Sequence, residues 1–376
     1  MVVFAAKLSV LFNKLGGQLL EYWKKKGAIA LLLLVMVSSL VGCATGPMTS
    51  PGWGGLGVSE DTLYVASSQG KVFAYDAENW VQKWVYPSDE KEARGPFYSA
   101  PTAVDDLVIV SSHAGVVYAL DTVTGYERWT FEAEKGFVGA PAVADGEVYV
   151  GNTDGKVYAL DATAGWAKWE FETGNWLWSS PVVDGDYLYV ASMDHKMYCV
   201  DRSTRQKVWE TEVGGAIPGT PLLADGTLYF GALDKKMYAM DAGSGSVHWE
   251  FEAESWNWGT PVLVDGTLYA GSLDQRIYAL DAASGRKQWD LELDGAVLAG
   301  AAYTDGVLYV PTDGGTLYAL DLATHNPKWP FSVEGRILVP PVVVGDFVCV
   351  NSMEAGLNVL VAESGLKRFT SAPDGK

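Results

Sequence analysis

From Leu56 onward, apolar and polar positions alternate in short runs that are separated by turn signals. Between residues 179 and 213 the runs are SSPVV, YLYVAS, KMYCVD and KVWETEV, with Asp184-Gly185 and Asp194-His195 between the first three. Short runs with this alternation predict β-strands, and a pair such as Asp154-Gly155 supplies the positive φ of a tight hairpin turn. Each such stretch therefore predicts four short antiparallel strands.

This four-strand unit recurs with a period of 40 residues, without an insertion across six units. One column of the repeat holds Pro101, Pro141, Pro181, Pro221, Pro261 and Pro341, with Ala301 in the remaining place. Another column holds Trp129, Trp169, Trp209, Trp249, Trp289 and Trp329, with Phe369 in the last unit. An earlier, longer unit starts near Leu56 and carries Asp76 and Trp84, so the chain contains eight units.

Four-stranded units of this length predict the blades of a propeller, because strand twist makes such sheets pack face to face around an axis. A solenoid is the alternative, but its exposed end faces would need polar caps, and neither end unit shows them. We therefore expect an all-β fold, an eight-bladed β-propeller of four-stranded antiparallel blades, over residues 56–376.

A recurring phrase joins the third strand of each unit to the fourth, as in Ala119, Asp121, Gly125 and Trp129. The small alanine lets a neighbouring ring approach, the aspartate accepts N–H bonds in the turn, and glycine adopts a backbone conformation that is costly for other residues. Tryptophan buries its ring between blades and directs its indole N–H to a carbonyl. We expect the phrase to hold blades together, through Ala119, Asp121, Gly125, Trp129, Asp161, Trp169, Asp201, Trp209, Asp241, Trp249, Asp281, Trp289, Asp321, Trp329, Asp76 and Trp84.

The phrase resembles the tryptophan-docking motif of the quinoprotein-type propellers, also called pyrroloquinoline quinone (PQQ) repeats. The resemblance extends from Leu56 to the end of the chain. In the last unit Asn358, Val361 and Phe369 replace the usual Tyr, Asp and Trp. We therefore expect weaker docking in the last unit. We also expect the ring to close there, beside the first blade.

The resemblance raises the question of a cofactor. In the related dehydrogenases PQQ lies at the axis above a tryptophan, near a calcium ion, and many of them have a disulfide between adjacent cysteines. This chain has no adjacent cysteines, and Lys and Arg, which the quinone carboxylates would require, are sparse in the axis-proximal segments. We expect no catalytic residue, cofactor or metal site, and a PQQ-dependent dehydrogenase is the alternative.

Other groups with catalytic potential have simpler explanations. His113, His195, His248 and His325 fall in different units without the spacing of metal ligands. Asp154, Asp194, Asp234, Asp274 and Glu354 share one position of the repeat and could form an acidic ring, but their expected role is to form hairpin turns.

The N-terminal segment indicates export. Lys24, Lys25 and Lys26 precede the apolar run 28–40, which is shorter than the ~20 residues of a membrane-spanning helix. The run leads into Leu40-Val41-Gly42-Cys43, which resembles the bacterial lipobox and implies a lipidated Cys43; an uncleaved anchor with a buried Cys43 is the alternative. The domain prediction is residues 1–43 as extension and lipoprotein signal, 44–55 as a short linker, and 56–376 as the propeller.

Charge and cysteines exclude two possibilities. With 27 Lys and Arg against 46 Asp and Glu, the net charge is −19, which argues against nucleic acid as a partner. Cys199 and Cys349 fall about half a ring apart, too far for a disulfide, so none is predicted.

An aromatic set precedes the proline column, in segments that lead from an outer strand to the next inner strand. It consists of Trp53, Tyr98, Trp176, Trp178, Trp256 and Trp258, and it predicts a binding face near the axis. The alternative is that these rings plug the central channel. The polar stretch from Pro87 to Pro96 is a candidate recognition loop on the same face.

A lipid-anchored propeller with these repeats is similar to the BamB family, lipoprotein scaffolds of outer-membrane β-barrel assembly, although no partner-binding motif can be matched residue by residue. We therefore expect a non-catalytic scaffold that binds a cell-envelope protein and is held to a membrane by lipid on the extracytoplasmic side. A sensor that binds a small ligand or glycan at the aromatic set is a further alternative.

Overall fold

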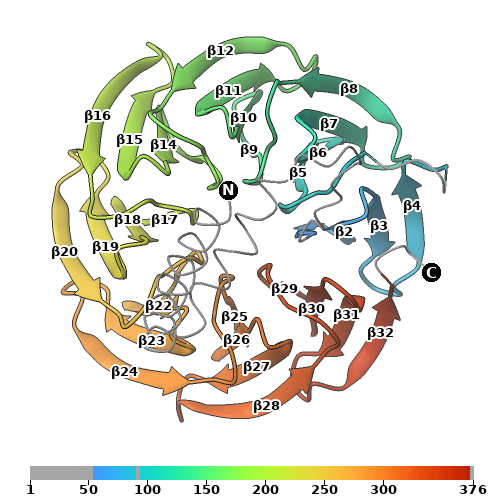
Figure 1. Ribbon diagram of the computed structural model, residues 1–376. Helices are drawn as coiled ribbons and strands as arrows, with labels where there is room; N and C mark the ends of the chain where they lie inside the picture. The colour runs from blue at the N-terminus through green and yellow to red at the C-terminus, as the bar shows by residue number, and fades with distance from the viewer. Residues whose placement is uncertain (1–53, 90–93, 373–376) are drawn as a thin grey trace, which may run out of the picture. The chain divides into compact units, whose positions relative to one another are not determined.

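The computed structural model describes residues 54–89 and 94–372, and these residues form a ring of eight four-stranded antiparallel sheets (Figure 1). The predicted all-β, eight-bladed propeller is confirmed. Each blade consists of four consecutive strands, the first nearest the axis and the fourth at the circumference. The described part contains no helix that is long and apolar enough to cross a bilayer. Cys43 and the predicted export signal lie outside the described residues.

The strand bounds repeat from blade to blade. Blade 1 holds β1 (Leu56–Ser59), β2 (Thr62–Ala66), β3 (Val72–Asp76) and β4 (Gln82–Tyr86); blade 2 holds β5 (Thr102–Val104), β6 (Leu107–Ser111), β7 (Val116–Asp121) and β8 (Glu127–Glu132). Blade 3 holds β9 (Ala142–Ala144), β10 (Glu147–Gly151), β11 (Lys156–Asp161) and β12 (Ala167–Glu172); blade 4 holds β13 (Val182–Asp184), β14 (Tyr187–Ala191), β15 (Lys196–Asp201) and β16 (Gln206–Glu212).

The second half follows the same pattern. Blade 5 holds β17 (Leu222–Ala224), β18 (Thr227–Gly231), β19 (Lys236–Asp241) and β20 (Val247–Glu252); blade 6 holds β21 (Val262–Val264), β22 (Thr267–Gly271), β23 (Arg276–Asp281) and β24 (Lys287–Glu292). Blade 7 holds β25 (Ala302–Thr304), β26 (Val307–Pro311), β27 (Thr316–Asp321) and β28 (Asn326–Ser332); blade 8 holds β29 (Val342–Val344), β30 (Phe347–Ser352), β31 (Gly356–Val361) and β32 (Lys367–Ser371).

The hydrophobic core lies between blades rather than in one central mass. Eight clusters of buried residues each join two neighbouring blades; one of them packs Tyr189 and Met197 of blade 4 against Phe230 and Tyr238 of blade 5. The two middle strands of each blade contribute most of these residues, whereas the outer strands alternate between buried and exposed positions. Each blade is therefore stabilised mainly by its neighbours.

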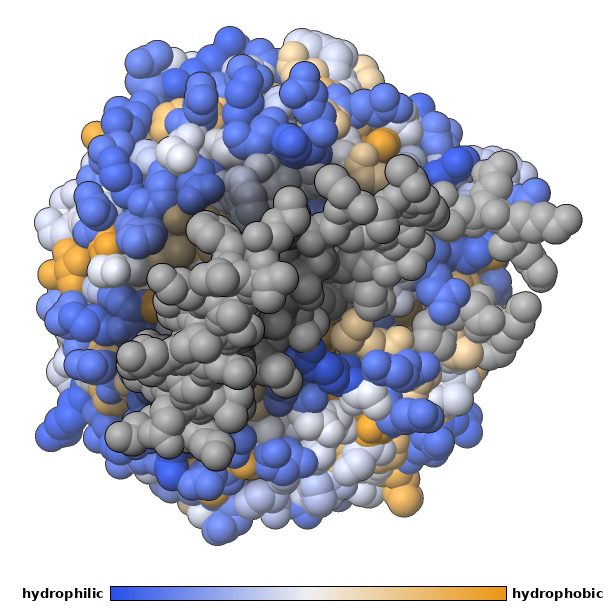
Figure 2. Space-filling view, viewed as in Figure 1, coloured by the Kyte–Doolittle hydropathy of each residue, from blue (hydrophilic) through white to orange (hydrophobic). Residues whose placement is uncertain are grey.

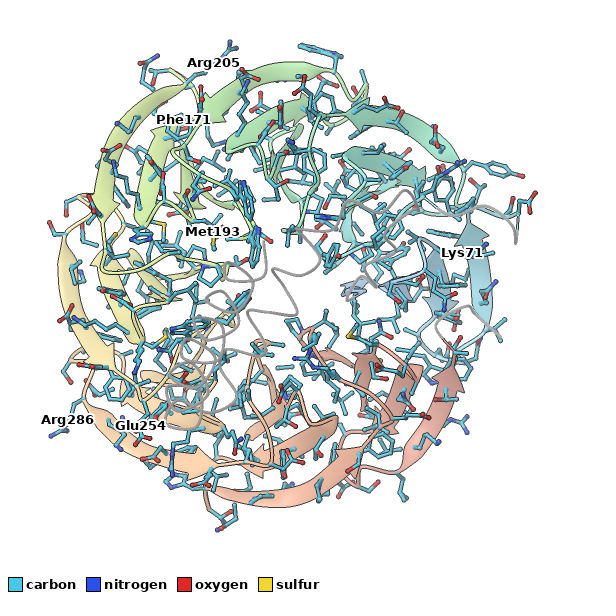
Figure 3. The ribbon with its side chains drawn as sticks, viewed as in Figure 1. Lys71, Phe171, Met193, Arg205, Glu254 and Arg286 are labelled. Atoms are coloured by element: carbon cyan, nitrogen blue, oxygen red, sulfur yellow. The ribbon has the colours of Figure 1, made fainter. Side chains whose placement is uncertain are left out.

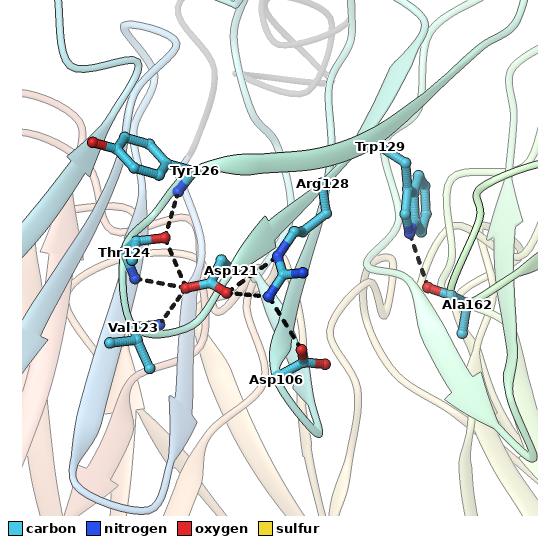
Figure 4. A network of polar contacts seen from close by, with 8 residues as sticks. All are labelled: Asp106, Asp121, Val123, Thr124, Tyr126, Arg128, Trp129 and Ala162. Atoms are coloured by element: carbon cyan, nitrogen blue, oxygen red, sulfur yellow. Dashed lines mark hydrogen bonds and ion pairs between the residues drawn. The ribbon is translucent and has the colours of Figure 1, made fainter.

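The tryptophan column joins one blade to the next. The indole N–H of Trp129 in blade 2 donates to the carbonyl of Ala162 in blade 3 at 2.9 Å (Figure 4). Trp84, Trp209, Trp249 and Trp329 make the same bond to the next blade, with Nε1–O distances of 2.9 to 3.2 Å. A β-bulge in the pairing of the third and fourth strands recurs in all eight blades and adds twist to the outer strand that carries the indole.

The glycine of the phrase lies directly under this indole. Gly285 has φ +70°, and a Cβ atom built there would lie 2.6 Å from Cδ2 of Trp249. The position therefore needs glycine for two reasons, the left-handed backbone and the space taken by the ring.

The aspartate of the phrase closes the turn. Oδ1 of Asp121 accepts N–H bonds from Val123 at 3.1 Å and Thr124 at 2.7 Å, and Oδ2 accepts from Nε of Arg128 at 3.1 Å (Figure 4). The bond from Arg128 is the main reason why the pKa of Asp121 lies well below its ordinary value. Hydrogen bonds within the turn also lower the pKa of the equivalent aspartates, Asp161, Asp201, Asp241, Asp281 and Asp321.

Three blades depart from glycine at this position, with Trp80, Arg205 and His325, all at positive φ. His325 stacks on Trp289 of the preceding blade, with ring centroids 4.6 Å apart. Arg205 lies at the outer circumference of the ring (Figure 3). The indole of Trp289 thus packs on the imidazole ring of His325, where most of the other indoles pack on a glycine.

The ring closes between blade 8 and blade 1. Here Phe369 occupies the tryptophan position of blade 8, and Trp80 occupies the glycine position of blade 1. Trp80 of blade 1 stacks on Phe369, with ring centroids 6.5 Å apart, and meets Phe347 edge-on at 5.2 Å. Tyr75 and Ser371 share a hydrogen bond of 2.8 Å across the same seam. The smaller ring of Phe369 is therefore accompanied by an indole from the opposite side, a compensation that the sequence analysis did not foresee.

The steric role of the motif glycine can be separated from its backbone role. Gly285→Ala and Gly266→Ala both place alanine at positive φ, but a Cβ at Gly266 meets no atom within 4 Å. We expect Gly266→Ala to lower the free energy of unfolding by about 1–2 kcal/mol and Gly285→Ala by a further ~1–3 kcal/mol, because only the latter displaces Trp249. Urea unfolding measures both, and equal losses would contradict the steric account.

The motif aspartates also predict an acid dependence of stability. The hydroxyl and amide of Ser244 are the main groups that lower the pKa of Asp241. Because the folded pKa lies below the unfolded one, this carboxylate stabilises the fold above about pH 4, and its contribution is lost as pH falls through the folded pKa. Asp241→Asn should therefore be less stable than the parent at neutral pH, and the difference should shrink on acidification.

Thermal melts from about pH 7 to about pH 2 measure that difference. Asp186→Asn, which removes an exposed carboxylate without a side-chain hydrogen bond, corrects for the change in net charge. A difference between Asp241→Asn and the parent that grows on acidification would contradict the assigned role.

Candidate binding face

The axial end of the ring is built from two kinds of segment. The connections that lead from each outer strand to the next inner strand pack on the hairpin turns between the second and third strands. The carbonyl of Trp176 accepts the N–H of Met193 at 3.0 Å, and that of Trp256 accepts the N–H of Leu273 at 2.9 Å. These repeated bonds place both kinds of segment on one face.

Three of the predicted aromatic residues meet on this face, and a fourth, Trp256, lies in the same segment as Trp258. Trp176 stacks on Trp178, with ring centroids 6.4 Å apart, and Trp178 meets Trp258 at 5.6 Å, although the two belong to segments two blades apart. Trp176 is 41% exposed, whereas Trp178, Trp256 and Trp258 are half-buried. The Trp178–Trp258 contact matches the plug interpretation, while Trp176 presents its ring to solvent.

The remaining predicted members of the set do not join this cluster. Tyr98 lies in the equivalent connection between β4 and β5, where its ring meets His113 edge-on at 4.8 Å. Trp53 lies outside the described residues. The candidate loop from Pro87 to Pro96 is described only in part; at its end the N–H of Arg94 donates to the carbonyl of Gly70 at 3.0 Å, in the hairpin turn of blade 1.

The structure adds three apolar residues that the sequence analysis missed. Met193, Leu233 and Leu273 occupy equivalent places in the hairpin turns of blades 4, 5 and 6 and are half-buried. Met193 lies on the axis side of its blade (Figure 3). In the same column blade 8 holds Met353, whereas blades 2, 3 and 7 hold His113, Thr153 and Asp313, so the three consecutive apolar residues of blades 4 to 6 were the available signal. We call Trp176, Trp178, Met193, Leu233, Trp256, Trp258 and Leu273 the axial apolar face.

A hollow of about 450 Å³ lies along the inner strands of blades 4 and 5. Its lining includes Val182 and Thr260, which come shortly after Trp178 and Trp258 in the chain. It also includes Asp184, at the end of β13, and Asp225 and Gly226, in the turn that follows β17. The lining contains apolar side chains and two carboxylates but no Lys, Arg or His. This composition does not fit PQQ, whose several carboxylates would need cations.

The acidic turn residues are used within their own turns. In Asp194, Oδ1 accepts the N–H of Lys196 at 3.0 Å, and Oδ2 accepts the hydroxyl of Tyr198 at 2.6 Å and the N–H of Gly174 at 2.7 Å. Burial, and then the bond to Asp194, raises the pKa of Tyr198. Asp154, Asp234 and Asp274 bond to the equivalent tyrosines. Their oxygens therefore stabilise hairpins.

The described cysteines are buried, and the described side chains that could bind a metal ion do not form a cluster. Burial raises the pKa of Cys199 to about 11 and that of Cys349 to about 12, which disfavours the reactive thiolates, and both thiols are free. Within residues 54–89 and 94–372, no three His, Cys, Asp or Glu side chains are grouped to hold a metal ion.

The family follows from a sequence match. A family model described as outer membrane protein assembly factor BamB matches residues 23–170, 172–296 and 273–375. The chain belongs to this family. No curated protein matches the sequence significantly.

Solved structures agree with the propeller fold. BamB from Moraxella catarrhalis is 18% identical, with a TM-score of 0.69 over 81% of this chain and 95% of that one. The computationally designed Ika8 protein is 13% identical, with a TM-score of 0.72 over 82% and 96%. A europium-containing methanol dehydrogenase is 15% identical, with a TM-score of 0.68 over 79% and 82%. At such low identities these likenesses show the fold alone.

A buried amide lies within the face. Asn257, between Trp256 and Trp258, is fully buried, and neither atom of its amide has a hydrogen-bond partner in the described protein. The equivalent residues Leu177, Ile217 and Val297 are apolar. An unpaired buried amide is destabilising.

Asn257→Val should therefore raise the free energy of unfolding by about 1–3 kcal/mol, because it removes the unpaired amide and restores the residue type of the next blade. The matched control, Val297→Asn, should lower it. Chemical denaturation measures both. A loss of stability in Asn257→Val would show that the amide has a partner in solution.

Proposed function

We propose that this protein is a non-catalytic lipoprotein scaffold of the cell envelope that binds another envelope protein during outer-membrane protein assembly. The observation that carries the proposal is the family match, which extends over nearly the whole chain. The match to the solved structure of BamB from Moraxella catarrhalis covers 95% of that chain. The correspondence is therefore between whole propellers.

The axial apolar face supports binding to a protein. Exposed tryptophans flanked by half-buried apolar residues are frequent anchors of protein interfaces, because an indole offers a large, rigid contact area. Trp176 is such a residue, backed by Trp178 and by the hairpin that holds Met193. The face seen in Figure 2 is largely hydrophilic around its rim, with apolar colour in separate small areas.

The non-catalytic part of the proposal is supported by the use of the polar groups. The turn acids bond to tyrosines and amides, both described cysteines are buried, and the hollow offers no cation to a quinone. The likeness to a methanol dehydrogenase reflects the shared propeller and does not transfer its chemistry.

The N-terminal sequence supports the proposed location. Cys43 ends a lipobox-like run behind a basic region and an apolar core, so export and lipidation would place the propeller on the extracytoplasmic side of a membrane. Cys43→Ser is then the variant that releases the chain from the membrane.

Site-specific photo-cross-linking in whole cells tests the scaffold role. A photoreactive residue is placed at Trp176 or, as the matched control, at Tyr187, which is also 41% exposed but begins β14 at the opposite end of the same blade. We expect a component of outer-membrane protein assembly to be captured from position 176 and not from position 187, because only the former lies on the axial apolar face.

The same cells carrying Trp176→Ala and Trp178→Ala should show lower levels of folded outer-membrane proteins. Capture from position 187 alone, or unchanged outer-membrane proteins in the double variant, would contradict the proposal. So would PQQ- and calcium-dependent dye reduction by the purified protein, which would favour the dehydrogenase alternative.

A further inference from the structure

A second apolar surface lies outside the axial apolar face. The residue after the glycine position of the docking phrase is apolar in four blades, as Val81, Tyr126, Trp166 and Leu366. These side chains are 62%, 73%, 56% and 68% exposed, respectively. They belong to blades 1, 2, 3 and 8, which are consecutive around the closed ring. We call these four residues the rim tips.

The other half of the ring is polar at the same position. Blades 4 to 7 carry Gln206, Ser246, Arg286 and Asn326, all exposed. Arg286 lies at the outer circumference of the ring (Figure 3), which locates this column of the repeat at the rim. The apolar and polar halves therefore divide the rim into two arcs of four blades each.

Folding does not require apolar side chains here. The rim tips contribute backbone groups to the turn and no side-chain hydrogen bond: the carbonyl of Tyr126 accepts the N–H of Asp121 at 2.8 Å and that of Trp166 accepts the N–H of Asp161 at 2.9 Å. Ser246 and Arg286 accept the same bond at 2.9 Å in their own blades. Since polar residues serve the turn equally well, four exposed apolar ones in one arc need another explanation.

The geometry points to a flat partner. Positions related by the repeat lie at the same height along the axis, so the four rim tips are points on half a circle in one plane. They occupy the end of the blades opposite to the axial apolar face, because the turn between the third and fourth strands lies beside the turn between the first and second: the N–H of Thr122 donates to the carbonyl of Asp106 at 3.0 Å. A continuous planar surface can touch all four at once.

We propose that the rim tips rest in the interfacial layer of the lipid bilayer to which the chain is anchored, an inference that depends on the lipoprotein part of the proposed function. Tryptophan and tyrosine are enriched where apolar and polar layers of a membrane meet, because each ring has an apolar body and a polar edge. Trp166 and Tyr126 supply these rings, and Val81, Leu366 and the 81% exposed Val123 add aliphatic contacts.

The length of the tether allows this orientation. Gly54 follows Cys43 by 11 residues, which span at most about 36–40 Å when extended. From the start of β1, the path to the rim end of blade 1 crosses three strand spacings, about 14 Å, and one five-residue strand, about 17 Å. The lipid on Cys43 can therefore reach the plane of the rim tips, and blade 1, where the chain enters, lies within their arc.

Charge determines which lipids suit the contact. Two cations near the rim tips are paired with acids, Lys83 with Asp61 at 3.1 Å and Lys168 with Glu147 at 2.5 Å, whereas Lys367 and Arg368, next to Leu366, are exposed and form no ion pair among the described residues. The acids of the same arc, which include Asp76, Asp121 and Asp161, outnumber these two unpaired cations and would repel anionic headgroups. The contact is apolar, favours zwitterionic lipid and persists in salt.

Vesicle binding by the full chain carrying Cys43→Ser tests the rim tips without the anchor. The test variant changes Val81, Tyr126, Trp166 and Leu366 to Ser; the matched control changes Gln206, Arg286 and Asn326 to Ser. We expect the test variant to bind phosphatidylcholine vesicles at least about tenfold more weakly than its parent, and the control to bind like the parent, since only the former loses inserted side chains. Unchanged melting temperatures would show that both variants are folded.

A second measurement locates the contact directly. Lipids with a quencher near the headgroup should quench the fluorescence of the parent more than that of Trp166→Phe. Equal vesicle binding by test and control variants, or binding only to anionic vesicles at low salt, would overturn the proposal. If the test variant binds vesicles like its parent, and a photoreactive residue at position 166 in a separate variant captures a protein, the proposal is overturned in favour of a protein partner. Absence of lipid on Cys43 of the unmodified chain would instead count against the proposed function, because the vesicle assay does not use that lipid.

Discussion

The structure depends on one contact, an indole that lies on the backbone of the next blade and donates its N–H to a carbonyl there. A four-stranded sheet of this size has too little core to be stable alone. Burying one such tryptophan is worth about 3–5 kcal/mol, and the contact recurs around the ring with variation at Trp169, Trp289 and Phe369. The turn aspartate and the motif glycine both serve this contact, one by fixing the turn and the other by leaving room for the ring.

Most of the fold could be predicted from the sequence because the constraint is periodic. A 40-residue spacing of Pro and Trp, with Asp at a fixed offset, specifies strand number, turn positions and the contact between blades at once. The departures are informative for the same reason. Trp80 was not recognised as part of the seam, because its partner Phe369 lies almost 300 residues away in the chain and only ring closure brings the two together.

The candidate site was harder to predict, because it depends on which segments meet across blades. The Trp178–Trp258 contact passes over blade 5, where Pro218 occupies the equivalent position, and no local pattern encodes that distance. Met193, Leu233 and Leu273 were missed because single apolar residues in hairpin turns are unremarkable until they are found side by side. Exposure and ring contacts, rather than residue type, distinguish this face from the other blade ends.

The closure of the ring has a topological consequence. Within residues 54–89 and 94–372, every sheet is built from four consecutive strands, so blades 8 and 1 share no sheet and meet through side chains. Blade 8 and blade 1 meet through Trp80, Phe369 and the Tyr75–Ser371 bond. Where the polypeptide starts is therefore arbitrary for the architecture, and a circularly permuted chain opened between any two blades retains every sheet intact.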